Sequence, residues 1–258
     1  MNSKRSMSIF IGEGIMRNSV YGAIIFVALF ITGGCRYSPV EQPILPPVTP
    51  QREGYVREEA VLVARGDHQY PPFEYINEEG EPDGFNVEIF RAVARVMDLN
   101  AVIDLGPWNE VREQIEEGEI DLLIGMYRSP DRDRDVDFTI PHFISSYYIF
   151  TRRDSDITGV EDLSDKTILV QDGDLGHDFV VEKGLGERII TRTEMTDVLT
   201  DLSRGDGDCA VVAIVQGTLL IRERGLDNLR VVGGPLVRRN YGFAVQEGNA
   251  ELLAVLNE

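Results

Sequence analysis

The chain has 258 residues, of which 43% are hydrophobic, so it can form one or two ordinary cores and is too apolar to be disordered throughout. Its 44 acidic and 25 basic residues give a formal net charge of −19, which repels phosphate backbones and excludes nucleic acid as an expected partner. The two cysteines cannot form a disulfide framework, and Cys209, in an apolar run, is expected to be a small buried hydrophobe.

Residues 20–31 form an apolar segment without charge, preceded by Arg17. At about 12 residues it is short for a transmembrane helix, which needs about 20, and has the length of a signal-peptide core. The segment ends in Thr32-Gly33-Gly34-Cys35, which resembles a lipoprotein lipobox, although Thr32 replaces the usual aliphatic residue. We therefore expect residues 1–35 to be a signal peptide or a lipoprotein signal with Cys35 lipidated, or else an uncleaved anchor. Each alternative places the folded part outside the cytoplasm, and a lipid on Cys35 or an uncleaved anchor would also tether it to the membrane.

Residues 36–57 are rich in proline and are expected to form an extended linker. The apolar stretch 61–64 then predicts a buried strand that ends at Asp67 and is followed by Tyr70-Pro71-Pro72-Phe73. Two prolines make this loop rigid, and open α/β sheets bind ligands at such strand ends. Asp67 and Tyr70 are thus expected to be one acidic and one aromatic wall of a small-molecule pocket.

Strands and helices alternate after this loop, which indicates parallel α/β architecture. A turn at 78–84 predicts a hairpin, and the following elements are a helix capped by Asn86, strand 101–105, a helix capped by Asn109 and strand 120–124.

A second α/β unit is predicted from about 155 to 235. Its expected elements are strand 167–170, helix 178–183, strand 189–190, a helix with apolar face from Met195 to Leu202, and strand 210–215. The extended stretches 145–150 and 240–245 flank this unit and could be two crossings between lobes. Residues 250–258 begin a helix without a terminating cap, which is compatible with a chain that continues past Glu258.

Several short motifs resemble, in order and spacing, the bacterial extracytoplasmic solute-binding proteins of family 3, the type II amino-acid-binding-like clamshells, over residues 58–258. The matching stretches are Asp67 with 70–73, then 80–88, 105–108, 118–122, 129–132 with 136–138, 162–173 and 207–210. The resemblance implies an α/β fold of two lobes, each a sheet flanked by helices, joined by two hinge crossings and closing on a ligand. Lobe 1 would span 58–148 and lobe 2 149–240, and 241–258 would return to lobe 1.

Carried over residue by residue, the resemblance implies seven ligand-binding residues: Asp67, Tyr70, Trp108, Gly125, Tyr127, Arg132 and Asp174. Arg132 matches the arginine that grips a ligand carboxylate, a role that suits the planar guanidinium fork. Tyr70 and Trp108 match the aromatic walls of the ligand cleft. Gly125 matches a backbone contact to the ligand, and Asp174 matches a ligand-contacting position in the second lobe. The residues alone leave alternatives open: Arg132 could belong to a surface cluster of arginines, and Trp108 could be a packed helix residue.

Two departures from the family pattern concern the ligand. Ala213 stands where amino-acid binders have the aspartate that pairs with the ligand ammonium, a loss of about 2–5 kcal/mol for an α-ammonium group. Tyr127 stands where a serine or threonine is usual and is expected to narrow the pocket.

The leading hypothesis is a membrane-tethered clamshell that binds a small carboxylate-bearing solute, an amino acid or another organic acid, and delivers it to an ABC-type importer. The alternative is the sensory domain of a transmembrane histidine kinase or diguanylate cyclase, which Ala213, the stretch 173–178 and the uncapped helix 250–258 favour. An enzyme is the third hypothesis, since motifs for a serine nucleophile, a P-loop or a dinucleotide site are missing from the sequence. No cofactor and no metal are expected, because the three histidines share no metal-ligand spacing and Val136 replaces the glycine that a calcium loop over 131–137 would need.

Overall fold

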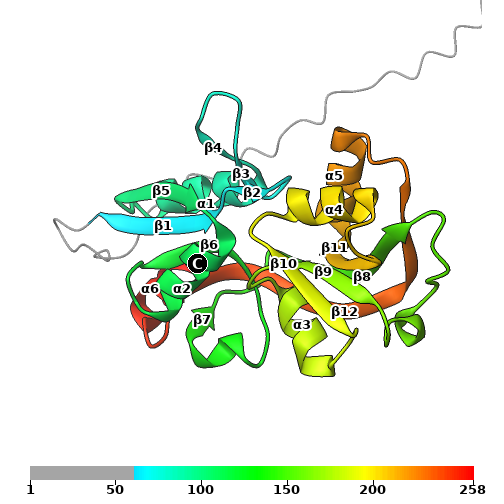
Figure 1. Ribbon diagram of the computed structural model, residues 1–258. Helices are drawn as coiled ribbons and strands as arrows, with labels where there is room; N and C mark the ends of the chain where they lie inside the picture. The colour runs from blue at the N-terminus through cyan, green and yellow to red at the C-terminus, as the bar shows by residue number, and fades with distance from the viewer. Residues whose placement is uncertain (1–60) are drawn as a thin grey trace, which may run out of the picture. The chain divides into compact units, whose positions relative to one another are not determined.

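A nine-stranded mixed sheet is the central element of the computed structural model, which describes residues 61–258 (Figure 1). The predicted signal or anchor segment 1–35, its Cys35 and the linker 36–57 lie outside the described residues. The strand order is β10-β9-β11-β8-β12-β6-β1-β5, with β7 paired to β12. We call the part with β1, β5 and β6 the first half and the part with β9, β10 and β11 the second half.

In the first half, β1 pairs in parallel with both β5 and β6, as the alternation of strands and helices predicts. Its elements are β1 (Leu62–Asp67), α1 (Phe85–Val96), β5 (Ala101–Gly106), α2 (Trp108–Glu116), β6 (Leu122–Tyr127), the 3-10 turn η1 (Arg132–Arg134), β7 (Val136–Phe138) and α6 (Ala250–Leu256). A small separate sheet of β2 (Gln69–Tyr70), β3 (Glu74–Ile76) and β4 (Pro82–Asp83) contains the predicted hairpin.

In the second half, β9 pairs in parallel with β10 and β11. Its elements are the 3-10 turn η2 (Val160–Asp162), β9 (Thr167–Gln171), α3 (Leu175–Lys183), β10 (Arg188–Arg192), α4 (Met195–Arg204), β11 (Cys209–Ala213) and α5 (Ile214–Arg224). Met195, Val198, Leu199 and Leu202 are fully buried, so the helical spacing in the sequence identified the inward face of α4. Cys209 is a free, buried cysteine, as its apolar setting predicts.

Two long antiparallel strands, β8 (Phe143–Arg152) and β12 (Leu229–Gln246), connect the halves. β12 pairs with β8 over one part of its length and with β6 and β7 over another, so it belongs to both halves. The predicted crossings 145–150 and 240–245 lie in these strands. The lobe boundaries expected at 148/149 and 240/241 fall within the same strands and remain a prediction.

Some helix starts differ from the sequence-based predictions. The N-cap of α1 is Gly84, because the amide of Asn86 is buried and donates to Glu74 Oε2 and Tyr241 Oη instead of capping the helix. The N-cap of α2 is Pro107 rather than Asn109. Strand β11 ends at Ala213 and α5 begins at Ile214, so the strand predicted at 210–215 is too long at its end. A continuous apolar run has no periodicity that would show where a strand gives way to a helix. Within residues 61–258, no helix combines the length and apolar character needed to cross a membrane.

Candidate functional site

A small cavity lies where strand ends from both halves meet. Three of its lining residues end strands: Asp67 ends β1, Tyr127 ends β6 and Gln171 ends β9. Two more lie at helix starts, since Trp108 begins α2 and Asp174 is the N-cap of α3. The eight lining residues are Asp67, Tyr70, Glu74, Trp108, Tyr127, Gln171, Asp174 and Tyr241. The cavity volume is ≈ 20 Å³, near the about 10–15 Å³ that one water requires and far below the about 300–1,000 Å³ of ligand pockets. A solute therefore has room only when the two halves move apart.

Three of the lining side chains are buried carboxyl groups. Burial raises the pKa of Asp67 to about 7, although hydrogen bonds from Gln69 N and Gln171 Nε2 oppose the shift. Burial likewise raises the pKa of Glu74 to about 8, although Asn86 Nδ2 and Asp67 N donate to its carboxylate. Burial also raises the pKa of Asp174, whose Oδ2 atom has no hydrogen-bond partner among the described residues. Among residues 61–258, no cationic side chain lines this cavity, so its chemistry favours a positively charged group of a ligand.

Four tyrosines fill the space around these acids. The hydroxyls of Tyr70 and Tyr127 are 2.8 Å apart and share a hydrogen bond, and Tyr147 Oη donates to Asp174 Oδ1 at 2.6 Å. The ring of Tyr127 contacts Tyr241 and Tyr147 edge to face, with centroid distances of 4.6 and 5.3 Å. Tyr127 thus lines the cavity and packs against two other tyrosines, and its effect on the width of a ligand pocket remains a prediction.

Arg132 lies in η1 beside the cavity, with its side chain fully buried. Its Nη2 and Nε atoms donate to Asp178 Oδ2 at 2.8 and 3.2 Å, and Nη1 donates to the Tyr127 carbonyl at 3.3 Å. The guanidinium carbon is 5.6 Å from the ring centroid of Trp108, within the range of a cation–π contact. The arginine predicted to grip a ligand carboxylate is therefore engaged by a carboxylate of the chain itself, from α3.

The carbonyl of Gly173 is a second acceptor from the second half. It receives Trp108 Nε1 at 2.8 Å, Arg112 Nη1 at 2.8 Å and Arg132 Nη2 at 3.0 Å. Arg112 Nη1 also donates to Asp178 Oδ1 at 3.1 Å. Gly173 has a φ of +67°, a conformation that favours glycine, and its carbonyl is directed toward the first half. Gly173 and Asp178 thus bind three donor side chains of the first half.

Five of the seven predicted ligand-binding residues line the cavity, and their role toward a ligand remains a prediction. Arg132 lies next to it. Gly125 does not line it, and a Cβ there would collide with Tyr241 Oη, Asn86 Nδ2 and the Glu74 carboxylate, so its visible role is close packing. Glu74, Gln171 and Tyr241 also line the cavity and were not predicted from the sequence. Gln171 ends a parallel strand as Asp67 does, and that shared position is the signal that could have identified it.

A protein-family model described as bacterial extracellular solute-binding proteins, family 3, matches residues 62–258. The chain belongs to this family. The L-cystine-binding protein TcyJ of Escherichia coli K12 is 25% identical over 206 residues, which cover 79% of this chain and 77% of that protein. The arginine-binding periplasmic protein of Mannheimia haemolytica is 28% identical over 178 residues, 67% of this chain and 70% of that protein.

Solved structures agree with this membership. A histidine kinase sensor domain with similarity to periplasmic binding proteins is 40% identical with a TM-score of 0.73, and the match covers 76% of this chain and 86% of that one. The holo arginine-binding protein ArgBP of T. maritima is 29% identical with a TM-score of 0.69 over 76% of this chain and 87% of that one.

The comparisons confirm the expected family and the mixed α/β type II periplasmic-binding-protein fold. This solute-binding protein is extracytoplasmic, and its family binds solutes rather than catalysing a reaction, which agrees with the sequence-based assignment.

Proposed function

We propose that this solute-binding protein captures a small amino-acid-type solute, with a carboxylate and a cationic group, between its two halves. The observation that supports this most is the cavity of three buried carboxyl groups beside the buried guanidinium of Arg132. The ligand-binding residues would be Asp67, Tyr70, Trp108, Gly125, Tyr127, Arg132 and Asp174, as the resemblance to the family implies.

In this proposal the ligand carboxylate displaces Asp178 from Arg132. Both are carboxylates that can accept from the same fork, so the exchange costs no buried unpaired charge on the arginine. The cationic group of the ligand would lie against Asp67 and Asp174, between aromatic side chains. Ala213, at the end of β11 and fully buried, offers no carboxylate, so the acids of the cavity replace the family's usual partner for the ammonium.

Capture would couple to closure, because the described cavity of ≈ 20 Å³ has no room for such a solute. The solute would enter between separated halves and then replace hydrogen bonds that now join them, notably Gln171 Nε2 to Asp67 Oδ2 at 3.2 Å.

The bound solute would be delivered to an ABC-type importer. A relative named ABC transporter arginine-binding protein 1 supports this role. Relatives named as cystine-binding and arginine-binding proteins support the choice of an amino-acid-type ligand. Residues 1–35 would tether the protein to the membrane as an anchor or through a lipid on Cys35, with 36–57 as spacer. Lobe 1 would comprise 58–148 and lobe 2 149–240, with 241–258 returning to lobe 1.

Ligand sensing by a transmembrane histidine kinase or diguanylate cyclase is a second candidate function. The specific observation in its favour is the identity of 40% to a histidine kinase sensor domain, against 29% to holo ArgBP. Sequencing the gene past the codon for Glu258 separates the two: a second hydrophobic span followed by a kinase or cyclase domain supports sensing, and a nearby stop codon supports transport.

Trp108 provides the experiment for solute capture, because it is the chain's single tryptophan and donates across the two halves to Gly173. We expect arginine, histidine or cystine, which carry both a carboxylate and a cationic group, to change its fluorescence saturably when titrated into the full chain. Arg132→Ala should weaken that response at least about tenfold, and Arg128→Ala, an exposed arginine nearby with a side chain 52% accessible, should not. A solute that binds Arg132→Ala and the unmodified protein equally would contradict the assigned role of Arg132.

A further inference from the structure

A second group of polar side chains joins the two halves outside the aromatic part of the cavity. Asp67 ends β1, His68 follows it, and Glu194 is the residue before α4. One ligand atom of each lies within 4.8 Å of the others, and His68 Nε2 is 2.8 Å from Glu194 Oε1. Two ligands of one tetrahedral zinc ion are about 3.3 Å apart, given Zn–N and Zn–O distances of about 2.0–2.1 Å. These three side chains are thus near the separation that a shared ion requires.

The charges of this group are unbalanced. Two carboxylates face a single imidazole, and Asp67 is only 3% exposed. Glu194 Oε2 is buried and lacks a hydrogen-bond partner within residues 61–258, which leaves an acceptor open beside His68. A buried carboxylate oxygen is stabilised by a hydrogen-bond donor or a cation, and the described residues supply no hydrogen-bond donor to this atom.

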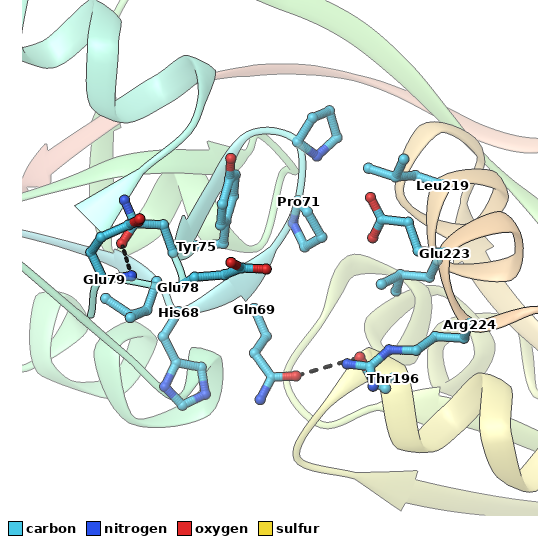
Figure 2. Close-up of a pocket in the computed structure, with 14 residues that line it drawn as sticks. His68, Gln69, Pro71, Tyr75, Glu78, Glu79, Thr196, Leu219, Glu223 and Arg224 are labelled. Atoms are coloured by element: carbon cyan, nitrogen blue, oxygen red, sulfur yellow. Dashed lines mark hydrogen bonds between the residues drawn. The ribbon is translucent and has the colours of Figure 1, made fainter. Parts of the chain in front are cut away.

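The surroundings provide both orientation and access. Gln69 N and Gln171 Nε2 donate to the two oxygens of Asp67 at 2.7 and 3.2 Å, so the carboxylate is held in place as outer-shell partners hold metal ligands. His68 also lines an open groove of ≈ 1030 Å³. Figure 2 shows His68, Gln69 and Tyr75 on one side of this groove and residues of α4 and α5 on the other. An ion can therefore reach His68 from solvent, and water can complete its coordination.

We propose that Asp67, His68 and Glu194 form a binding site for a first-row divalent metal ion of the zinc class, which bridges the two halves. Imidazole and carboxylate ligands with an open position for water suit Zn²⁺, and also admit Ni²⁺ or Cu²⁺. Mg²⁺ is a poor fit, because it prefers six oxygen ligands in octahedral geometry. Since Asp67 and His68 belong to one half and Glu194 to the other, the ion stabilises their contact. Asp67 also lines the solute cavity, so metal and solute binding are coupled.

The test is calorimetric titration of ZnCl₂ into the full chain, purified without a polyhistidine tag, treated with chelator and kept free of added solute. We expect one Zn²⁺ to bind per chain and to raise the melting temperature. His68→Ala and Glu194→Gln should each bind Zn²⁺ at least about tenfold more weakly, and MgCl₂ should give no comparable effect.

His177→Ala is the matched control, because His177 Nδ1 lies 3.4 Å from Asp172 Oδ1 and its side chain is 25% exposed, against 27% for His68. This variant should bind Zn²⁺ as the unmodified protein does. Circular dichroism of Glu194→Gln, which is nearly isosteric, verifies that loss of binding is not loss of folding. The proposal would be overturned if the unmodified protein and the three variants bound Zn²⁺ with equal affinity. It would also be overturned if the unmodified protein bound no Zn²⁺ and His68→Ala and Glu194→Gln only lowered the melting temperature. Since no solute is present, this outcome is independent of the proposed solute capture.

Discussion

Arg132 donates from both Nε and Nη2 to the same carboxylate oxygen of Asp178, across the two halves of the protein. The arginine side chain is fully buried, whereas that of Asp178 is 32% exposed. Asp178 thus occupies the guanidinium that we propose binds a ligand carboxylate, and it is the more accessible partner of the pair. A solute that reaches the cavity must compete with it.

The first prediction concerns this competition. Asp178→Asn removes the negative charge but keeps the size of the side chain, so Arg132 should become more available to a ligand carboxylate. We expect affinity for a carboxylate-bearing solute to rise by about tenfold, which corresponds to about 1.4 kcal/mol. Isothermal titration calorimetry measures this affinity, with Asp172→Asn as the control because the Asp172 side chain is 46% exposed and pairs with His177. An affinity that falls in Asp178→Asn would mean that Asp178 assists ligand binding instead of opposing it.

The second prediction is a difference in stability between two arginines of the same loop. Arg132→Leu leaves Asp178 paired with Arg112, so the free energy of unfolding should fall by about 1–3 kcal/mol. This loss is smaller than the about 3–5 kcal/mol expected when one partner of a fully buried ion pair is removed. Arg128→Leu breaks an exposed pair with Asp133 and should cost less than about 1 kcal/mol. Urea unfolding measures both free energies. Equal losses would show that burial of Arg132 adds nothing to the strength of its ion pair.

Sequence reasoning found what depends on local pattern. Asp67 and Tyr70 were predicted to line a pocket because they lie where a strand is followed by two prolines, and both line the cavity. The buried face of α4 was predicted because its apolar residues recur at helical spacing. Contacts between the halves have no such pattern: Arg132 and Asp178 are 46 residues apart, and His68 and Glu194 are 126 apart. Their pairing depends on how the two parts of the sheet are joined, which residue spacing does not encode.

The third prediction follows from the raised pKa of Asp174. Burial is the main cause, and the negative charge of Asp178 raises the pKa further. The hydrogen bonds from Tyr147 and Leu175 N and the positive charge of Arg132 lower the pKa, but burial outweighs them. The folded state therefore binds the Asp174 proton more tightly than the unfolded state does. The stability from this protonation is complete below the unfolded pKa of about 3.9 and is lost as pH rises through the folded value.

We therefore expect Asp174→Asn to gain stability relative to the unmodified protein as pH rises above about 4, the unfolded pKa of an aspartate. The amide oxygen can still accept from Tyr147 and Leu175, so folding should be retained. Free energies from urea unfolding at several pH values give this difference. A difference that is constant with pH, or that declines on the alkaline side, would contradict a raised pKa for Asp174.

The fourth prediction tests the close packing at Gly125. Gly125→Ala places a methyl group against Tyr241, Asn86 and Glu74, and should destabilise the protein by about 1–3 kcal/mol. Gly234→Ala is the control, because a Cβ there meets nothing within 4 Å and no positive φ is involved, so its effect should stay within about 0.5 kcal/mol. Thermal unfolding followed by circular dichroism compares them. Equal stability of the two variants would mean that the neighbours of Gly125 move aside at little cost.

The fifth prediction restores the acid that the family pattern places at Ala213. This residue is fully buried at the end of β11 and is the N-cap of α5, where a side-chain oxygen can accept from the helix amides. Ala213→Asp should raise affinity for an α-amino acid by about tenfold or more, since a close charge pair to the ammonium contributes about 2–5 kcal/mol before the cost of burying the carboxylate. Affinity for the matching α-hydroxy acid, which lacks the ammonium, should not rise. Ala213→Asn separates charge from capping, because it can cap α5 without a negative charge. If Ala213→Asn improves amino-acid binding as much as Ala213→Asp, then the gain comes from the helix cap, and the missing acid is not what limits recognition of an ammonium group.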